Sequence, residues 1–301
     1  MPTASERQPG AVRRLAVLGS PIAHSQSPAL HAAAYARLGL DWSYESADVV
    51  SGDLAAFIEG CGPEWRGLSL TMPLKQAVLP LLDTVGQVAR MAGTANTLLF
   101  DDAPEGPPER VLRGFNTDVA GIVRALAAAG LSAARLVHIL GGGATAASAM
   151  VAAAELGAEH VLLSVRSLER SAWLEPLAHT LGLAVGIRPL AHAGESRGEP
   201  DLVISTLPGG VDTGMVFPEP VRRRALLLDV AYDPWPSPLA RSWQQAHGHV
   251  LSGLAMLVHQ ALLQVRVFVS GDPLQPLGDE DGVLTAMLDA VGLDAAGVSV
   301  S

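Results

Sequence analysis

Two polar residues, Lys75 and Asp118, could form a proton-transfer couple. Both lie in otherwise apolar stretches, Lys75 after Ser69-Leu-Thr-Met-Pro-Leu and Asp118 after Gly114-Phe-Asn-Thr. The basic residues of the chain are almost entirely arginine, so a lysine kept here suggests a task that arginine cannot perform, the release of a proton. Such a group can supply or take up the proton that accompanies hydride transfer. We therefore expect Lys75 and Asp118 to be catalytic.

A glycine-rich loop at residues 141–146 is typical of dinucleotide binding. It fits the pattern G-x-G-x-x-A between an expected strand at 136–140 and an expected helix at 144–155. The first glycine allows a tight turn, the second lets a pyrophosphate approach the backbone, and the small last residue lets helix and strand pack closely. The helix N-terminus offers N–H groups to the phosphates. An ordinary glycine turn is the alternative. The expected cofactor contacts are Gly141, Gly142, Gly143, Ala144, Thr145 and Ala146.

The end of the next expected strand, at 160–165, indicates which dinucleotide binds. An acidic residue there favours NAD, and an arginine favours the additional phosphate of NADP. Arg166 follows the strand directly, with Ser167 and Arg170 close behind, which favours a phosphate clamp. Glu169 falls inside the next helix, and two solvated surface arginines are the alternative interpretation. We expect NADP.

Strands and helices alternate around these residues, which predicts an α/β fold with a mainly parallel sheet. Ser27 is expected to cap the first helix. The first block has strands at 15–18, 44–50, 67–70, 95–100 and 111–114, helices at 28–38, 54–59, 74–82 and 87–91, and a surface hairpin loop at 101–109. The second block has helices at 119–129 and 144–155, strands at 136–140, 160–165, 202–205, 225–230 and 250–252, and then helices at 253–269 and 282–291.

Composition excludes several classes of function. A formal net charge of −10 argues against nucleic acid as the main partner. The apolar stretch 141–163 is interrupted by glycines and charges, which argues against a membrane span. The single cysteine, Cys61, and a polar start at 1–11 without a secretion signal predict a cytoplasmic protein. The histidines show no metal-ligand spacing, so we expect no metal. A small molecule is the expected partner, and a homodimer is the candidate assembly.

Six motifs in order along the chain resemble those of shikimate dehydrogenases. They lie at residues 19–28, 70–75, 92–97, 116–118, 229–234 and 253–261. The resemblance covers nearly the whole chain and implies the NADP-dependent, reversible reduction of 3-dehydroshikimate to shikimate in aromatic amino-acid biosynthesis. It also implies an α/β substrate-binding domain split in sequence, at 1–117 and 253–301, around an inserted Rossmann-fold domain at 118–252 that binds NADP.

The resemblance also assigns site residues. Lys75 and Asp118 match the catalytic couple. The groups that match those holding the substrate carboxylate are Ser25, Ser27, Thr71 and Tyr232. Asn96, Asp118 and Gln260 match the groups that hold the ring hydroxyls. The expected cofactor contacts extend to Thr206, Gly253 and Met256.

The sequence departs from the family pattern at three places. No arginine follows the glycine loop, and Val165 and Ser69 stand where asparagine is common. Within the same fold, an NAD-preferring quinate/shikimate dehydrogenase and a relative that acts on an aminated analogue are the open alternatives. A non-catalytic protein that binds shikimate is the alternative from another class.

Overall fold

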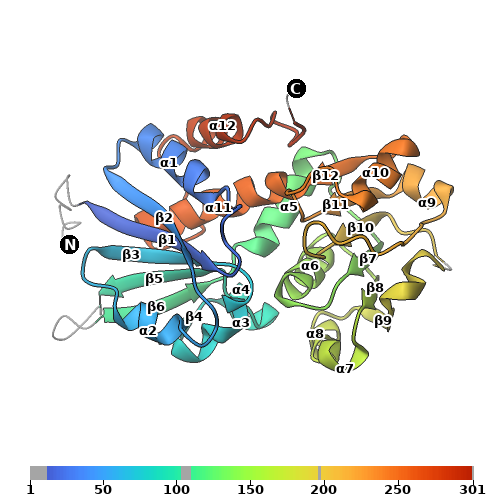
Figure 1. Cartoon of the computed structure of the whole chain (residues 1–301), viewed down its shortest axis with the longest axis horizontal. Coiled ribbons are helices and arrows are strands. Elements are labelled where there is room, and N and C mark those ends of the chain that lie inside the picture. The colour runs from blue at the N-terminus through green and yellow to red at the C-terminus, as the bar shows by residue number, and fades with distance from the viewer. Residues whose placement is uncertain (1–11, 103–109, 196–197, 300–301) are drawn as a thin grey trace.

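Two separate six-stranded sheets organise the chain (Figure 1). The structure is a computed structural model that describes residues 12–102, 110–195 and 198–299. The first sheet has the order β2-β1-β3-β5-β6-β4. Its strands are β1 (Arg13–Gly19), β2 (Trp42–Asp48), β3 (Trp65–Leu70), β4 (Thr84–Val85), β5 (Thr97–Asp102) and β6 (Arg110–Phe115). The second has the order β12-β11-β10-β7-β8-β9. Its strands are β7 (Leu136–Leu140), β8 (His160–Val165), β9 (Ala184–Pro189), β10 (Leu202–Ser205), β11 (Leu226–Asp229) and β12 (Val250–Ser252).

The two sheets differ in strand direction. All pairs in the second sheet are parallel, as expected. In the first sheet β5 runs antiparallel to both β3 and β6, whereas the other pairs are parallel, so the sheet is mainly parallel as expected and the β5–β6 pair agrees with the hairpin expected between these strands. Antiparallel neighbours need no crossover helix between them, which is why β5 and β6 follow each other directly. Most of the expected loop at 101–109 lies outside the described residues, as does the polar start at 1–11.

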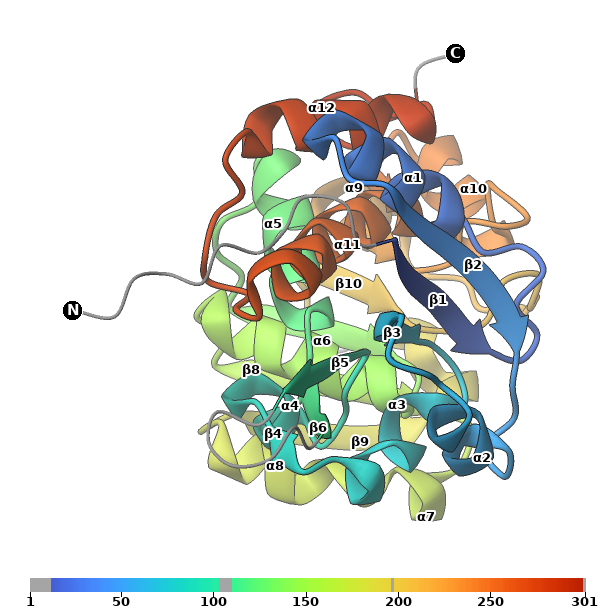
Figure 2. The ribbon, with the colours of Figure 1, turned by 90° about the vertical axis from the view of Figure 1, so that its left-hand side faces the viewer.

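Helices cover both faces of each sheet. Figure 2 shows the first sheet between one group, α1 (Ser27–Leu38), α11 (Gly253–Ser270) and α12 (Glu280–Ala290), and a second, α2 (Leu54–Glu59), α3 (Leu74–Ala77) and α4 (Gln87–Ala92). The second part of the chain contributes α5 (Asp118–Ala128), α6 (Ala144–Glu155), α7 (Leu168–Ser171), α8 (Leu174–Thr180), α9 (Glu219–Arg224) and α10 (Pro238–Gln245). Two short 3-10 helices, η1 (Leu79–Leu81) and η2 (Leu190–Glu195), complete the list.

Two expected local features are corrected by the structure. The helix expected at 74–82 is interrupted after Ala77, because Pro80 has no N–H for a continuous α-helix and the chain forms η1 instead. Ser27 does not cap α1: it is the first helical residue, Gln26 occupies the capping position, and no side chain makes a capping bond.

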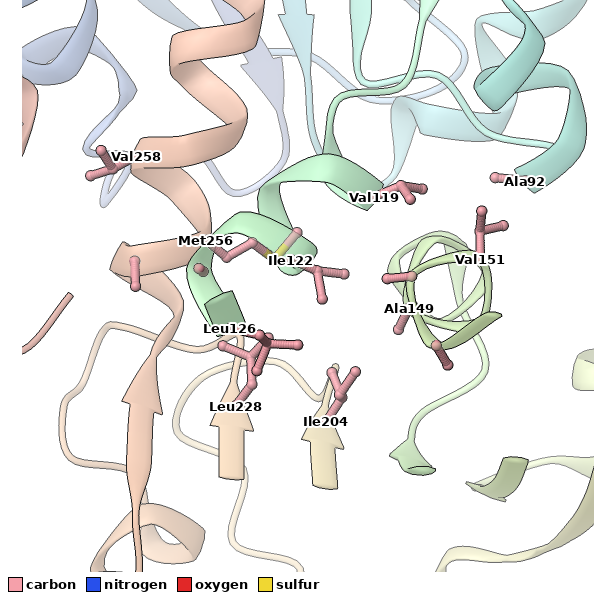
Figure 3. Packing of buried hydrophobic residues seen from close by; sticks show 14 of the residues in the cluster. Ala92, Val119, Ile122, Leu126, Ala149, Val151, Ile204, Leu228, Met256 and Val258 are labelled. Atoms are coloured by element: carbon pink, nitrogen blue, oxygen red, sulfur yellow. The ribbon is translucent and has the colours of Figure 1, made fainter. Parts of the chain in front are cut away.

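Helix α11 crosses the middle of the molecule and packs on α5, joining the cores of the two sheets. Figure 3 shows Ile122 and Leu126 of α5 lying between Met256 of α11 and the second-sheet residues Ile204 and Leu228. Among the described residues, α11 is the one helix whose length and composition would let it cross a membrane, and 78% of it is buried inside the fold. It is therefore a core helix that fixes the two sheets side by side.

Candidate active site

The lysine and aspartate singled out from the sequence meet between the two sheets. The Lys75 Nζ lies 2.5 Å from Asp118 Oδ2, and the two side chains are only 11% and 3% exposed. Lys75, the only lysine of the chain, is placed by the short helix α3 that follows β3. Asp118 is the first residue of α5, where the positive end of the helix dipole favours a carboxylate. The pair is thus a buried, charge-assisted hydrogen bond between two segments far apart in sequence.

Asn96 connects this pair to the central helix. Its Nδ2 donates to Asp118 Oδ1 at 2.8 Å and to Gln260 Oε1 at 3.1 Å. Its Oδ1 accepts the backbone N–H of Thr117 at 2.9 Å, which fixes which way the amide points. Lys75, Asp118, Asn96 and Gln260 therefore form one hydrogen-bonded cluster, as the sequence analysis expected of residues that handle one substrate.

The hydroxyl groups expected to bind a carboxylate come from three segments. Ser25 is half-buried and its Oγ accepts the backbone N–H of Ser27 at 3.3 Å. Thr71 follows β3, and its N–H donates to the carbonyl of Leu18 at the end of β1. Tyr232 reaches this place from the second sheet. Burial raises the pKa of its phenol, and a hydrogen bond from the Gln26 backbone lowers it.

A contact between a histidine and an aspartate closes the same end of the site. His24 Nδ1, in the loop before α1, lies 2.8 Å from Asp233 Oδ2, which follows Tyr232. Both side chains are largely in solvent. The loop after β11 thus touches the loop after β1 at two neighbouring points, and the site is bounded by both halves of the chain.

The three glycines of the loop differ in what surrounds them. Gly141 has a φ of +113°, which favours glycine, and a Cβ there would collide with Thr206 Oγ1. A Cβ on Gly142 would collide with Ser171 Oγ, whereas one on Gly143 would meet no atom. Gly143 precedes α6, whose free N–H groups face the loop. Ala146 is fully buried, so its small side chain permits the close packing of helix and strand.

The other expected cofactor residues surround this loop at different depths. Arg166 and Arg170 are exposed and form no ion pair with any residue that the structure describes. Ser167 caps α7 by accepting the N–H of Arg170 at 3.3 Å. Gly253 begins α11, where a Cβ would collide with the Val230 carbonyl. Met256 packs among apolar side chains rather than in a cavity (Figure 3).

Several residues that support the cluster or the glycine loop were not predicted from the sequence. The Asn116 Oδ1 accepts the backbone N–H of Asp118 at 2.9 Å, and its Nδ2 donates to Ser148 of α6 at 3.0 Å. Trp173 donates its indole N–H to the Gly142 carbonyl at 3.3 Å. Gln264 lies one turn beyond Gln260 on α11, and this polar i, i+4 pair on an apolar helix was a signal that could have found it.

No set of three or more metal-ligating side chains occurs within the described ranges. The described cysteine, Cys61, is free and buried.

This chain resembles known shikimate dehydrogenases in sequence and in structure. Residues 17–98 match the model of the shikimate dehydrogenase substrate binding domain. A shikimate dehydrogenase (NADP(+)) of Methanothermobacter thermautotrophicus is 32% identical over 282 residues, covering 91% of this chain and 96% of that protein. The crystal structure of shikimate dehydrogenase from Mycobacterium tuberculosis is 38% identical with a TM-score of 0.75, covering 92% of this chain and 99% of that one. That of shikimate 5-dehydrogenase from Thermus thermophilus, in complex with NADP(H) and shikimate, is 32% identical with a TM-score of 0.74, covering 93% and 100%.

Proposed function

Since this chain belongs to the shikimate dehydrogenase family, we propose how its own residues carry out the reaction of that family. The chain is an NADP-dependent shikimate dehydrogenase, an oxidoreductase that reversibly reduces 3-dehydroshikimate to shikimate. When bound, NADP(H) supplies or accepts the hydride at the carbon that carries the reacting oxygen. The remaining chemistry is the movement of one proton at that oxygen, and it falls to residues of this chain.

Lys75 moves that proton, and Asp118 assists it. In the reducing direction the Lys75 ammonium donates a proton to the carbonyl oxygen of the substrate, and in the oxidising direction the neutral amine takes it back from the hydroxyl. Asp118 balances the ammonium charge through the 2.5 Å contact and orients the amine. This contact, between two buried groups that the fold brings from different segments, is the observation that supports the proposal most strongly.

The substrate is held by uncharged donors. Ser25, Ser27, Thr71 and Tyr232 offer hydroxyl groups to its carboxylate, which suits a protein with a net charge of −10. Burial raises the pKa of Tyr232, so its phenol stays a donor across the physiological range. Asn96 and Gln260, already bonded to each other, face the ring hydroxyls.

The residues around the glycine loop fit a dinucleotide with an additional phosphate. Gly141 and Gly142 let the loop pack closely against Thr206 and Ser171, Gly143 borders open space, and the N-terminus of α6 attracts the pyrophosphate. Arg166 and Arg170 are exposed at the end of β8, where the 2′-phosphate of NADP would lie. The wider set of cofactor contacts in the proposal consists of Gly143, Ala144, Thr145, Ala146, Ser167, Thr206, Gly253 and Met256.

The proposal includes the organisation of the chain. Residues 1–117 and 253–301 form the substrate-binding domain, and 118–252 form the NADP-binding domain.

The free thiol of Cys61 is compatible with a reducing cytoplasm, where we place the enzyme. A homodimer without membrane or nucleic-acid partners completes the proposal, and light scattering during gel filtration tests the dimer.

The decisive experiment follows the nicotinamide absorbance while the purified protein oxidises shikimate, with NADP and NAD in parallel. We expect rapid reduction of NADP and a much smaller rate with NAD. Equal or better turnover with NAD, above all on quinate, would contradict the role given to Arg166. Binding of shikimate without turnover by either cofactor would contradict the roles given to Lys75 and Asp118.

A further inference from the structure

Behind the proposed substrate site, Gln264 is a buried amide whose hydrogen-bonding capacity is fully used. It lies on α11 one turn after Gln260 and is 1% exposed. Its Nε2 donates to the backbone carbonyl of Asn96 at 3.0 Å and to Thr97 Oγ1 at 3.1 Å. Because a carbonyl can only accept, the orientation of the amide is fixed, and Oε1 points to the opposite side. There it accepts the Ser69 hydroxyl at 2.8 Å and contacts His31 Nε2 at 3.3 Å.

The fixed amide determines where the neighbouring protons lie. Burial lowers the pKa of His31 to about 3, so the ring is neutral and must carry its proton on Nε2 to meet the Gln264 oxygen. Nδ1 then accepts the hydroxyl of Tyr35 at 3.0 Å. On the other side Thr97 accepts from Gln264, so its own proton goes to Asn96 Oδ1, 2.9 Å away. The direction of each hydrogen bond is therefore set by its neighbour.

This series of hydrogen bonds ends at Asn96, which is bonded to Asp118. Asn96 receives the Thr97 proton at Oδ1 and donates from Nδ2 to Asp118 Oδ1. Gln264 also donates to the backbone carbonyl of Asn96, so residues of α11 restrain both the backbone and the side chain of Asn96. We infer that Gln264 and Thr97 are positioning residues for Asn96, and through it for the Lys75–Asp118 couple. The inference rests on the proposed function and extends it to two residues that touch no substrate.

The first test compares Thr97→Val, which removes the hydroxyl at constant shape, with Thr97→Ser, which keeps it. Loss of one hydrogen bond to Asn96 is expected to lower kcat for shikimate about tenfold, while the KM for NADP stays unchanged. Thr97→Ser is expected to keep kcat within about twofold. Tyr35→Phe is the matched control, because it removes a buried hydroxyl of the same cluster on the far side of His31. It is expected to lower stability without changing kcat.

The second test uses pH to separate positioning from packing. In Gln264→Glu the ionised side chain can still accept from Ser69 but has no proton to donate to the Asn96 carbonyl, whereas the protonated form can donate one. The ratio of its kcat to that of the unchanged enzyme is therefore expected to rise as the pH falls, and Gln264→Met is expected to show a low, pH-independent ratio.

Two results would overturn the inference: a kcat of Thr97→Val equal to that of Thr97→Ser, or a pH-independent ratio for Gln264→Glu. Variants that do not fold are recognised by circular dichroism, and the Thr97 pair, which differ by a single group, then decide alone. If the unchanged protein does not oxidise shikimate, the proposed function fails instead. In that case calorimetry shows whether the unchanged protein still binds shikimate without turning it over.

Discussion

A buried neutral histidine at the centre of the second sheet should make the protein sensitive to acid. His138 lies on β7, is 0% exposed, and shares a 2.8 Å hydrogen bond with Ser164 through Nε2. Its Nδ1 has no hydrogen-bond partner among the described residues, and Phe217 packs against its ring. Burial, and then the nearby charge of Arg188, lower its pKa from 6.5 to about 3. The folded protein therefore keeps this ring neutral where an unfolded chain would protonate it.

The sign and size of the effect follow from that difference. Because the pKa of His138 is lower in the folded state, the unfolded state binds more protons below pH 6.5, and stability falls as the pH drops from 6.5 towards 3. Between pH 7.5 and pH 5.0 this one residue costs about 2 kcal/mol of the free energy of unfolding, at about 1.4 kcal/mol for each pH unit below 6.5. A folded pKa one unit higher would leave this value almost unchanged, since pH 5.0 would still lie above it.

Urea unfolding of His138→Gln and of the unchanged protein at both pH values measures this term. Tryptophan fluorescence follows the transition, and the quantity compared is the loss of unfolding free energy between the two pH values. We expect the loss to be about 2 kcal/mol smaller in the variant, whatever its stability at pH 7.5. The control is His179→Gln, at an exposed position on α8, which should keep the full loss. An identical loss in His138→Gln and the unchanged protein would refute the buried neutral histidine.

Other substitutions test the site and the fold. Lys75→Ala is expected to lower kcat for shikimate by about 10² to 10⁴ with little change in KM, and an unchanged kcat would remove the lysine from the mechanism. Arg166→Ser is expected to raise the KM for NADP about tenfold and leave that for NAD unchanged, as the loss of one charge-assisted contact predicts. Thermal unfolding should separate Gly253→Ala, whose Cβ would collide with the Val230 backbone, from Gly143→Ala, whose Cβ meets nothing. We expect a large fall in Tm for the first and almost none for the second.

The Lys75–Asp118 pair could be singled out from the sequence because each residue lies in a distinctive local setting. Lys75 stands out in an arginine-using chain, and the motif around Asp118 resembles a known one. The 2.5 Å contact between them confirms that the two segments meet. The supporting residues could not be found in this way. Gln264 matters only because α11 lies beside β3 and β5, a contact made across 168 residues to Asn96.

In the fold, too, features set by neighbouring residues could be predicted, and features that depend on distant segments could not. The turn at Gly141 and the helix after it are dictated by neighbouring residues, and both occur as expected. The strand β9 was not expected, because it is a partly exposed edge strand that contains Gly186 and Pro189, two residues that weaken a strand pattern. The antiparallel pairing of β5 with β6 agrees with the hairpin loop expected at 101–109, whereas the pairing of β5 with β3 joins strands that are distant in the sequence and has no local signal.

The burial of the chain's only lysine also makes the active site separately addressable. A lysine-specific protease has one peptide bond to cut in this protein, between Lys75 and Gln76, in the short helix α3. With the amine held against Asp118, cleavage requires this segment to open, either locally or in global unfolding, so a cleavage rate above that of global unfolding measures local opening of the site. In the same way, isotope-labelled methyl groups attached to the lysine side chain would give a signal from one residue only, and that signal would report on the Lys75 amine.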